Sequence, residues 1–100
     1  MTLAPGLPVS PDQIREICQR YHIRELGLFG SAARGEMSPD SDVDILVEFD
    51  PEASIGWQFF DLEQELTTLF GRTVDLGTKA SLKPRIRASV LRDLRVLYAA

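Results

Sequence analysis

Two aspartates separated by one residue open the most apolar stretch of this chain. Asp42 and Asp44 stand at i and i+2, and residues 43–49 are mostly β-branched or otherwise apolar. Such a run predicts a β-strand that packs on a core. Because successive side chains of a strand alternate between its faces, both carboxylates would point the same way, roughly 7 Å apart. The core is then expected on the opposite face, where Val43 and Ile45 point.

Two carboxylates on one face, with no basic residue between them, repel each other unless a cation lies there. Mg²⁺ binds carboxylate oxygens together with substrate phosphates. Gly30 and Ser31 precede the aspartates, at a point where a short strand over residues 26–29 would pass into one helical turn over 31–34. Free amides at a helix start attract phosphate, glycine lets the backbone approach it, and the serine hydroxyl can donate to it. The pattern indicates a site for a nucleotide triphosphate and metal ions.

Arg34 lies three residues after Ser31, where its guanidinium could bind the same phosphates in a bidentate manner. The alternative for Arg34 is a surface ion pair with Glu36 or Asp40. The sequence alone leaves both interpretations open.

Asp75 interrupts the apolar, β-prone run of residues 73–76. A carboxylate buried in such a strand is unfavourable unless it meets a metal ion or a hydrogen-bond donor. If Val74 and Leu76 face the core, Asp75 faces the side to which Asp42 and Asp44 also point. The alternative is a short edge strand with an exposed aspartate.

Three carboxylates and a triphosphate can share a site only if counter-ions are present. Two Mg²⁺ ions would supply four positive charges and bridge the protein to the phosphates. We expect Asp42 and Asp44 to hold both ions. Asp75 would complete the site for the ion that activates the incoming hydroxyl, and it could accept the proton of that hydroxyl.

The remaining pattern predicts an α/β domain in the order α-β-α-β-α-β-α. Ser10 reads as an N-cap with Pro11 at the first helical position and Gln13 completing a capping box. The later elements are expected at residues 26–29, 31–34, 42–49, 56–70, 73–76 and 84–94, with Gly71 ending the helix before it. Residues 96–98 either extend the last helix or add an edge strand.

Composition limits the classes of function. One hundred residues suit a single domain, with its core at about residues 12–98, and 44% hydrophobic with 26% charged residues is typical of a soluble globular protein. The net charge of −4 argues against a dedicated nucleic-acid binder. Cys18, the single cysteine, excludes an internal disulfide. We see neither a secretory leader nor a membrane-length apolar run, and expect a cytoplasmic protein.

The C-terminal segment is basic despite the acidic whole. Its cations are Lys83, Arg85, Arg87, Arg92 and Arg95. Three interpretations would explain them: a solvated helix face, a docking surface for an acidic partner, or a contact with ATP phosphates.

The pair Gly30-Ser31, ten residues, then Asp42-Val43-Asp44, with Asp75 in a later strand, resembles the DNA polymerase β-like nucleotidyltransferase superfamily. The closer resemblance is to its minimal nucleotidyltransferase (MNT) branch, the antitoxins paired with HEPN-domain ribonuclease toxins. It spans about residues 12–98 and rests on the segments FGSAARG (29–35), SDVDILV (41–47), GRTVDL (71–76) and LKPRIR (82–87).

This resemblance implies a minimal nucleotidyltransferase fold, a small mixed β-sheet flanked by helices. It also implies transfer of AMP from Mg-ATP to a tyrosine hydroxyl of a cognate HEPN toxin, in a toxin–antitoxin complex that silences the ribonuclease. The turn Gly30-Ser31 matches the phosphate-contacting turn of the family, and Arg34 fits the pattern beside it. The three catalytic, metal-binding carboxylates of the family match Asp42, Asp44 and Asp75.

Two other functions remain open at this point. A non-catalytic antitoxin would inhibit its toxin by binding alone, although an intact set of three carboxylates argues against a relic site. Nucleotidyl transfer to a small molecule or an RNA end is disfavoured by the short, acidic chain. Because one hundred residues leave no room for a helical acceptor-binding domain, we expect the acceptor site to be shared with a partner protein.

Overall fold

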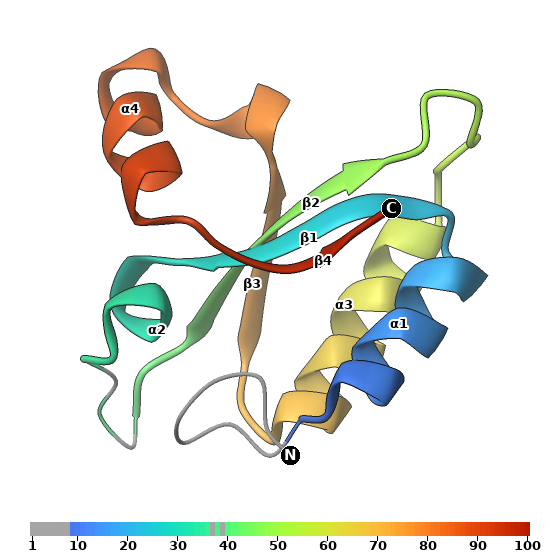
Figure 1. Ribbon diagram of the computed structural model, residues 1–100, viewed down its shortest axis with the longest axis horizontal. Coiled ribbons are helices and arrows are strands. Elements are labelled where there is room, and N and C mark those ends of the chain that lie inside the picture. The colour runs from blue at the N-terminus through green and yellow to red at the C-terminus, as the bar shows by residue number, and fades with distance from the viewer. Residues whose placement is uncertain (1–8, 37, 39) are drawn as a thin grey trace.

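A four-stranded mixed sheet forms the centre of the computed structural model, which describes residues 9–36, 38 and 40–100 (Figure 1). The strand order is β3-β2-β1-β4. Strand β1 pairs antiparallel with both β2 and β4, whereas β3 runs parallel to β2. The strands are β1 (Ile23–Phe29), β2 (Val43–Phe49), β3 (Val74–Thr78) and β4 (Arg95–Ala99).

Four α-helices and one 3-10 turn join these strands. The helices are α1 (Pro11–Arg20), α2 (Gly30–Arg34), α3 (Gln58–Phe70) and α4 (Pro84–Asp93), and the 3-10 turn η1 (Lys79–Ser81) follows β3. Helices α1 and α3 lie side by side, where Arg20 forms a bidentate ion pair with Glu65. Helix α4 lies beside α2, at the other side of the molecule in this view (Figure 1).

The core lies between one face of the sheet and the helices α1 and α3. In β2 the buried residues Val43, Ile45 and Val47 alternate with residues of the other face, where Asp44 and Glu48 are half-buried and Leu46 is buried. The helices contribute fully buried side chains to the same cluster: Ile14, Cys18, Leu62 and Leu66. Burial of each large aliphatic side chain stabilises the fold by about 1.5–3 kcal/mol. The alternation predicted for β2 is confirmed.

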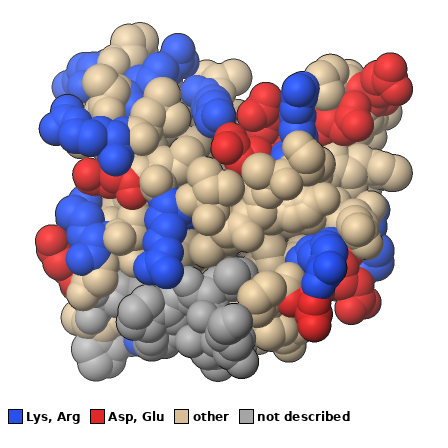
Figure 2. Space-filling view, in the orientation of Figure 1, with Lys and Arg blue, Asp and Glu red and all other residues tan. Residues whose placement is uncertain are grey.

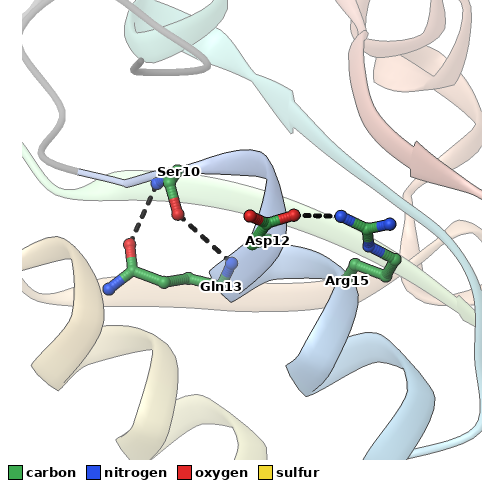
Figure 3. A network of polar contacts seen from close by, with 4 residues as sticks. All are labelled: Ser10, Asp12, Gln13 and Arg15. Atoms are coloured by element: carbon green, nitrogen blue, oxygen red, sulfur yellow. Dashed lines mark hydrogen bonds and ion pairs between the residues drawn. The ribbon is translucent and has the colours of Figure 1, made fainter.

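Helix α1 begins with the predicted capping box. The Ser10 Oγ accepts from the Gln13 amide at 3.3 Å, and the Gln13 Oε1 accepts from the Ser10 amide at 2.9 Å (Figure 3). Each of these bonds satisfies an amide that the helix itself leaves free. Asp12, in the same first turn, forms an exposed ion pair with Arg15 in this view.

The structure decides one open alternative and corrects one boundary. Residues 95–99 form β4, the edge strand that the sequence left open beside an extension of the last helix, and this strand pairs with β1. Strand β1 also begins earlier than expected, at Ile23. Helix α1 ends at Arg20, and His22 adopts a left-handed φ of 56° that turns the chain directly into the strand.

Among the described residues, no helix combines the length and the apolar character needed to cross a bilayer.

Candidate active site

Asp44 and Asp75 are direct neighbours on adjacent strands. The parallel pairing of β2 with β3 sets Asp44 opposite Asp75, just as it sets Val43 opposite Val74. Because both valines are buried on the core side, the two carboxylates point to the opposite face. The sequence predicted this shared face, and the register between the strands confirms it.

Asp42 belongs to the same group, although it precedes β2 by one residue instead of opening the strand. Partial burial raises the pKa of Asp44, and the charges of Asp75 and Asp42 raise this pKa further. The charge of Arg34 lowers it. The fold therefore concentrates negative charge around Asp44, and a cation bound there would relieve the repulsion.

The glycine turn lies directly against Asp44. In the antiparallel register of β1 with β2, Phe29 stands opposite Asp44, so the next residue turns over the carboxylate. Gly30 has a φ of +66°, and a Cβ built on it would lie 2.5 Å from the Asp44 Oδ2. Glycine is required here by the backbone conformation and by the close approach. The predicted phosphate-binding turn, with Ser31 half-buried as its next residue, is thus in contact with the carboxylates.

Arg34 ends the short helix α2 and forms two ion pairs. Its Nε lies 3.4 Å from the Glu36 Oε1, and its Nη1 lies 3.2 Å from the Asp93 Oδ2 of α4. The pairing with Glu36 is one of the alternatives that the sequence left open. Asp93 was missed because it lies 59 residues away, and no local pattern signals the contact. The charge of Arg34 still lowers the pKa of Asp44. Arg34 therefore forms surface ion pairs and also acts on the candidate site.

Asp75 corrects one prediction. The carboxylate is exposed, and β3 is an edge strand of the sheet. The argument that burial of Asp75 demands a metal ion was therefore wrong, and the alternative of an edge strand with an exposed aspartate describes its position. Asp75 belongs with Asp44 because of strand register, not because of burial.

The donor atoms fit Mg²⁺ in the way that nucleotide-dependent enzymes use it. Among the described residues, no group of three His, Cys, Asp or Glu side chains forms a ready-made metal site. Mg²⁺ typically takes one or two protein carboxylates and completes its octahedral shell with substrate phosphates and water. The carboxylates of Asp42, Asp44 and Asp75 are hard oxygen donors next to the predicted phosphate-binding turn, which suits such a shared shell.

A second polar group on the same sheet face escaped the sequence reasoning. The Lys79 Nζ lies 2.9 Å from the Glu25 Oε2 and 3.5 Å from the Glu48 Oε2. Glu48 points to the same face as Asp44 because it stands four residues further along β2. The contact joins residues 54 positions apart, so no motif could have found it.

The carboxylates lie on an open part of the surface. Asp42 and Asp75 are exposed, and Asp44 is half-buried. Two hollows of the described surface lie elsewhere: one between α1 and α3, and one lined by residues 50 and 52–55. A macromolecular acceptor can therefore approach the carboxylates directly.

Known proteins resemble this chain in sequence and in fold. A profile of the nucleotidyltransferase domain family matches residues 11–97. The protein adenylyltransferase MntA of Thermococcus cleftensis is 48% identical over 80 residues, which cover 80% of this chain and 80% of that protein. A solved structure described as a candidate minimal nucleotidyltransferase is 34% identical with a TM-score of 0.72, over 85% of this chain and 86% of that one.

A more distant structure comes from Shewanella oneidensis, a tri-AMPylated HEPN toxin in complex with an MNT antitoxin. The matching chain is 20% identical with a TM-score of 0.63, over 90% of this chain and 70% of that one. At this identity the likeness shows a shared fold.

Proposed function

Because the chain belongs to the nucleotidyltransferase domain family, we propose that it is a protein adenylyltransferase that acts as an antitoxin. It transfers AMP from ATP to a tyrosine hydroxyl of a cognate HEPN-domain toxin and thereby neutralises the toxin. The Thermococcus relative is a protein adenylyltransferase, and the Shewanella complex pairs an MNT antitoxin with an AMPylated HEPN toxin. The observation that carries the proposal is the register that sets Asp44 beside Asp75, directly under the Gly30 turn.

The nucleotide is bound by the turn and by Arg34. Gly30 lets the turn lie directly against Asp44, and the Ser31 hydroxyl at this turn donates a hydrogen bond to a phosphate oxygen. The Arg34 guanidinium leaves its exposed partners, Glu36 and Asp93, for the phosphates, because a bidentate contact with a doubly charged group is stronger than two solvent-screened ion pairs.

Asp42 and Asp44 would hold Mg²⁺, and Asp75 would complete the ligand set. When bound, Mg²⁺ neutralises phosphate charge and lowers the pKa of the attacking hydroxyl. Asp75 is the more exposed member of the strand pair, so it faces the side from which the acceptor arrives and takes the hydroxyl proton. The tyrosine oxygen forms a bond to the α-phosphorus. The bond from this phosphorus to the oxygen that leads to the β-phosphate breaks, and pyrophosphate leaves with the electron pair.

Intact mass spectrometry of the co-expressed HEPN protein tests this function. We expect its mass to rise by whole AMP units with the wild-type chain and to stay unchanged with Asp42→Ala/Asp44→Ala. The control is Asp61→Ala/Glu63→Ala on α3, which changes the net charge equally and should leave the transfer intact. An unmodified partner that co-purifies with the wild-type chain and stays inactive would show inhibition by binding alone.

A further inference from the structure

Helix α4 stands at the surface with little packing beneath it. None of its ten residues is buried. One side of the helix faces the rest of the molecule: Val90 and Asp93 are half-buried, and Asp93 pairs with Arg34 of α2. The next residue, Leu94, packs on β1, where a Cβ built on Gly27 would lie 2.7 Å from its Cδ1. Val90 and Asp93 therefore mark the side of α4 that faces the rest of the molecule.

The other side of the helix forms one continuous exposed strip. Its residues stand at i, i+3, i+6 and i+7, which is the spacing of a single helical face. All four are exposed, and Leu91 leaves 40% of its surface open to solvent. We call this strip the outer face of α4, and it consists of Arg85, Ala88, Leu91 and Arg92.

The cations of the outer face are uncompensated. Neither Arg85 nor Arg92 has a hydrogen bond or an ion pair with any described residue, whereas Arg20 and Lys79 are paired with glutamates. Lysine and arginine side chains gather at the upper left of Figure 2, over the position of α4 in Figure 1. An acidic chain thus keeps unpaired positive charge on the outer face of this helix.

We infer that the outer face of α4 is the docking surface for the acceptor protein, and that it takes an acidic stretch with an apolar side chain seated on Leu91. This inference rests on the proposed function. Arginines around an exposed leucine are typical of protein–protein interfaces, where Arg is enriched and apolar contacts fill the centre. An exposed leucine makes no favourable contact with phosphate, so a site for phosphate alone does not explain Leu91.

Helix α4 is linked to the candidate active site through Arg34. Asp93 ties the helix to Arg34 at 3.2 Å, and Arg34 lies within electrostatic reach of Asp44. Helix α4 is thus attached to the element that carries Arg34, and the opposite charges of its outer face and an acidic acceptor raise the rate of their encounter.

The charge reversal Arg85→Glu/Arg92→Glu tests the inference in AMP transfer to the cognate HEPN protein. We expect the KM for the HEPN protein to rise at least about tenfold, or about 1.4 kcal/mol of binding, with kcat and the Kd for Mg-ATP unchanged. Higher salt should weaken the binding of the wild-type chain more than that of the variant. The control Arg15→Glu/Arg24→Glu makes the same change in net charge on α1 and β1 and should leave the KM unchanged.

Several results would overturn the inference. An unchanged KM, or an equal rise in the control, would remove the outer face from acceptor binding. A weaker Kd for Mg-ATP would assign the two arginines to the nucleotide instead. Should the reversal variant fail to fold, Arg85→Gln/Arg92→Gln and Leu91→Ser repeat the test without reversing charge. If the wild-type chain binds the HEPN protein but transfers no AMP, the proposed function fails. The Kd values of the wild type, the reversal variant and the control for the HEPN protein then still test the docking surface.

Discussion

At the scale of single residues, Asp44 and Gly30 each carry a feature that lowers the stability of the folded chain. Asp44 is half-buried between two other carboxylates, which raise its pKa together with desolvation. Gly30 adopts a left-handed conformation and touches the same carboxylate. Both features oppose stability, and both suit a site whose charge is completed by a substrate and its metal ions.

Asp44→Asn is expected to stabilise the metal-free chain by a few degrees at about pH 7, because it removes the repulsion, and to abolish AMP transfer. The raised pKa means that the folded wild-type protein binds this proton more tightly than the unfolded chain. The free energy of unfolding of the wild type therefore increases as pH falls through that pKa. The difference in Tm between D44N and the wild type narrows accordingly. Thermal melts in EDTA at several pH values measure this difference. A lower Tm for D44N, or a difference that widens in acid, would contradict the argument.

Gly30→Ala is expected to lose most of the transfer activity, because the added Cβ displaces the Asp44 carboxylate and the φ of +66° strains the backbone. Gly35→Ala is a matched control. Gly35 has a φ of +72°, and a Cβ there meets nothing within 4 Å, so this variant carries the strain without the clash. Transfer rates and melting temperatures of both variants separate the two effects. Equal loss of activity in both would assign the role of Gly30 to backbone strain alone.

At the scale of helices and strands, what could be predicted from the sequence was local. The capping box at Ser10, the alternation in β2 and Gly71 at the end of α3, with a φ of 70°, each depend on neighbours within a few residues. Strand order depends on which distant segments pair. The sequence therefore offered the exposed edge-strand position of Asp75 and the strand at residues 95–99 only as alternatives that it could not decide, and it gave no sign of the Arg34–Asp93 contact.

Ser10→Ala is expected to destabilise the chain by about 1 kcal/mol, because the Gln13 amide loses its cap. For a domain of this size the Tm should fall by about 4–8 °C. Ser89→Ala, at an exposed position inside α4, serves as the control and should not lower the Tm. Thermal denaturation followed by circular dichroism measures both. An unchanged Tm for the Ser10 variant would mean that water replaces the cap at no loss.

At the scale of the whole molecule, the sheet separates two tasks. One face packs on α1 and α3 and supplies the core, while the other carries the carboxylates and adjoins α2 and α4. The site can therefore stay open and highly charged without weakening the packing that holds the strands together.

Mg²⁺ is expected to raise the Tm of the wild-type chain, since a cation that binds only the folded state stabilises it by about 2.7 kcal/mol at a hundred times its Kd. Asp42→Ala/Asp44→Ala should lose this gain, and Na⁺ at equal ionic strength should not reproduce it. EDTA should stop AMP transfer, and added Mg²⁺ should restore it. Transfer that persists in EDTA would exclude the ions from the mechanism.

The pairing of Asp44 with Asp75 across β2 and β3 also has a consequence in time. A ribosome adds Asp44 well before Asp75, and the whole of α3 is made between them. A nascent chain that has released only its first two strands holds the glycine turn and the first two aspartates but not the third. The proposed set of three carboxylates is therefore complete only once β3 has been made, so we expect a product truncated before Asp75 to fail in AMP transfer whatever part of it had folded.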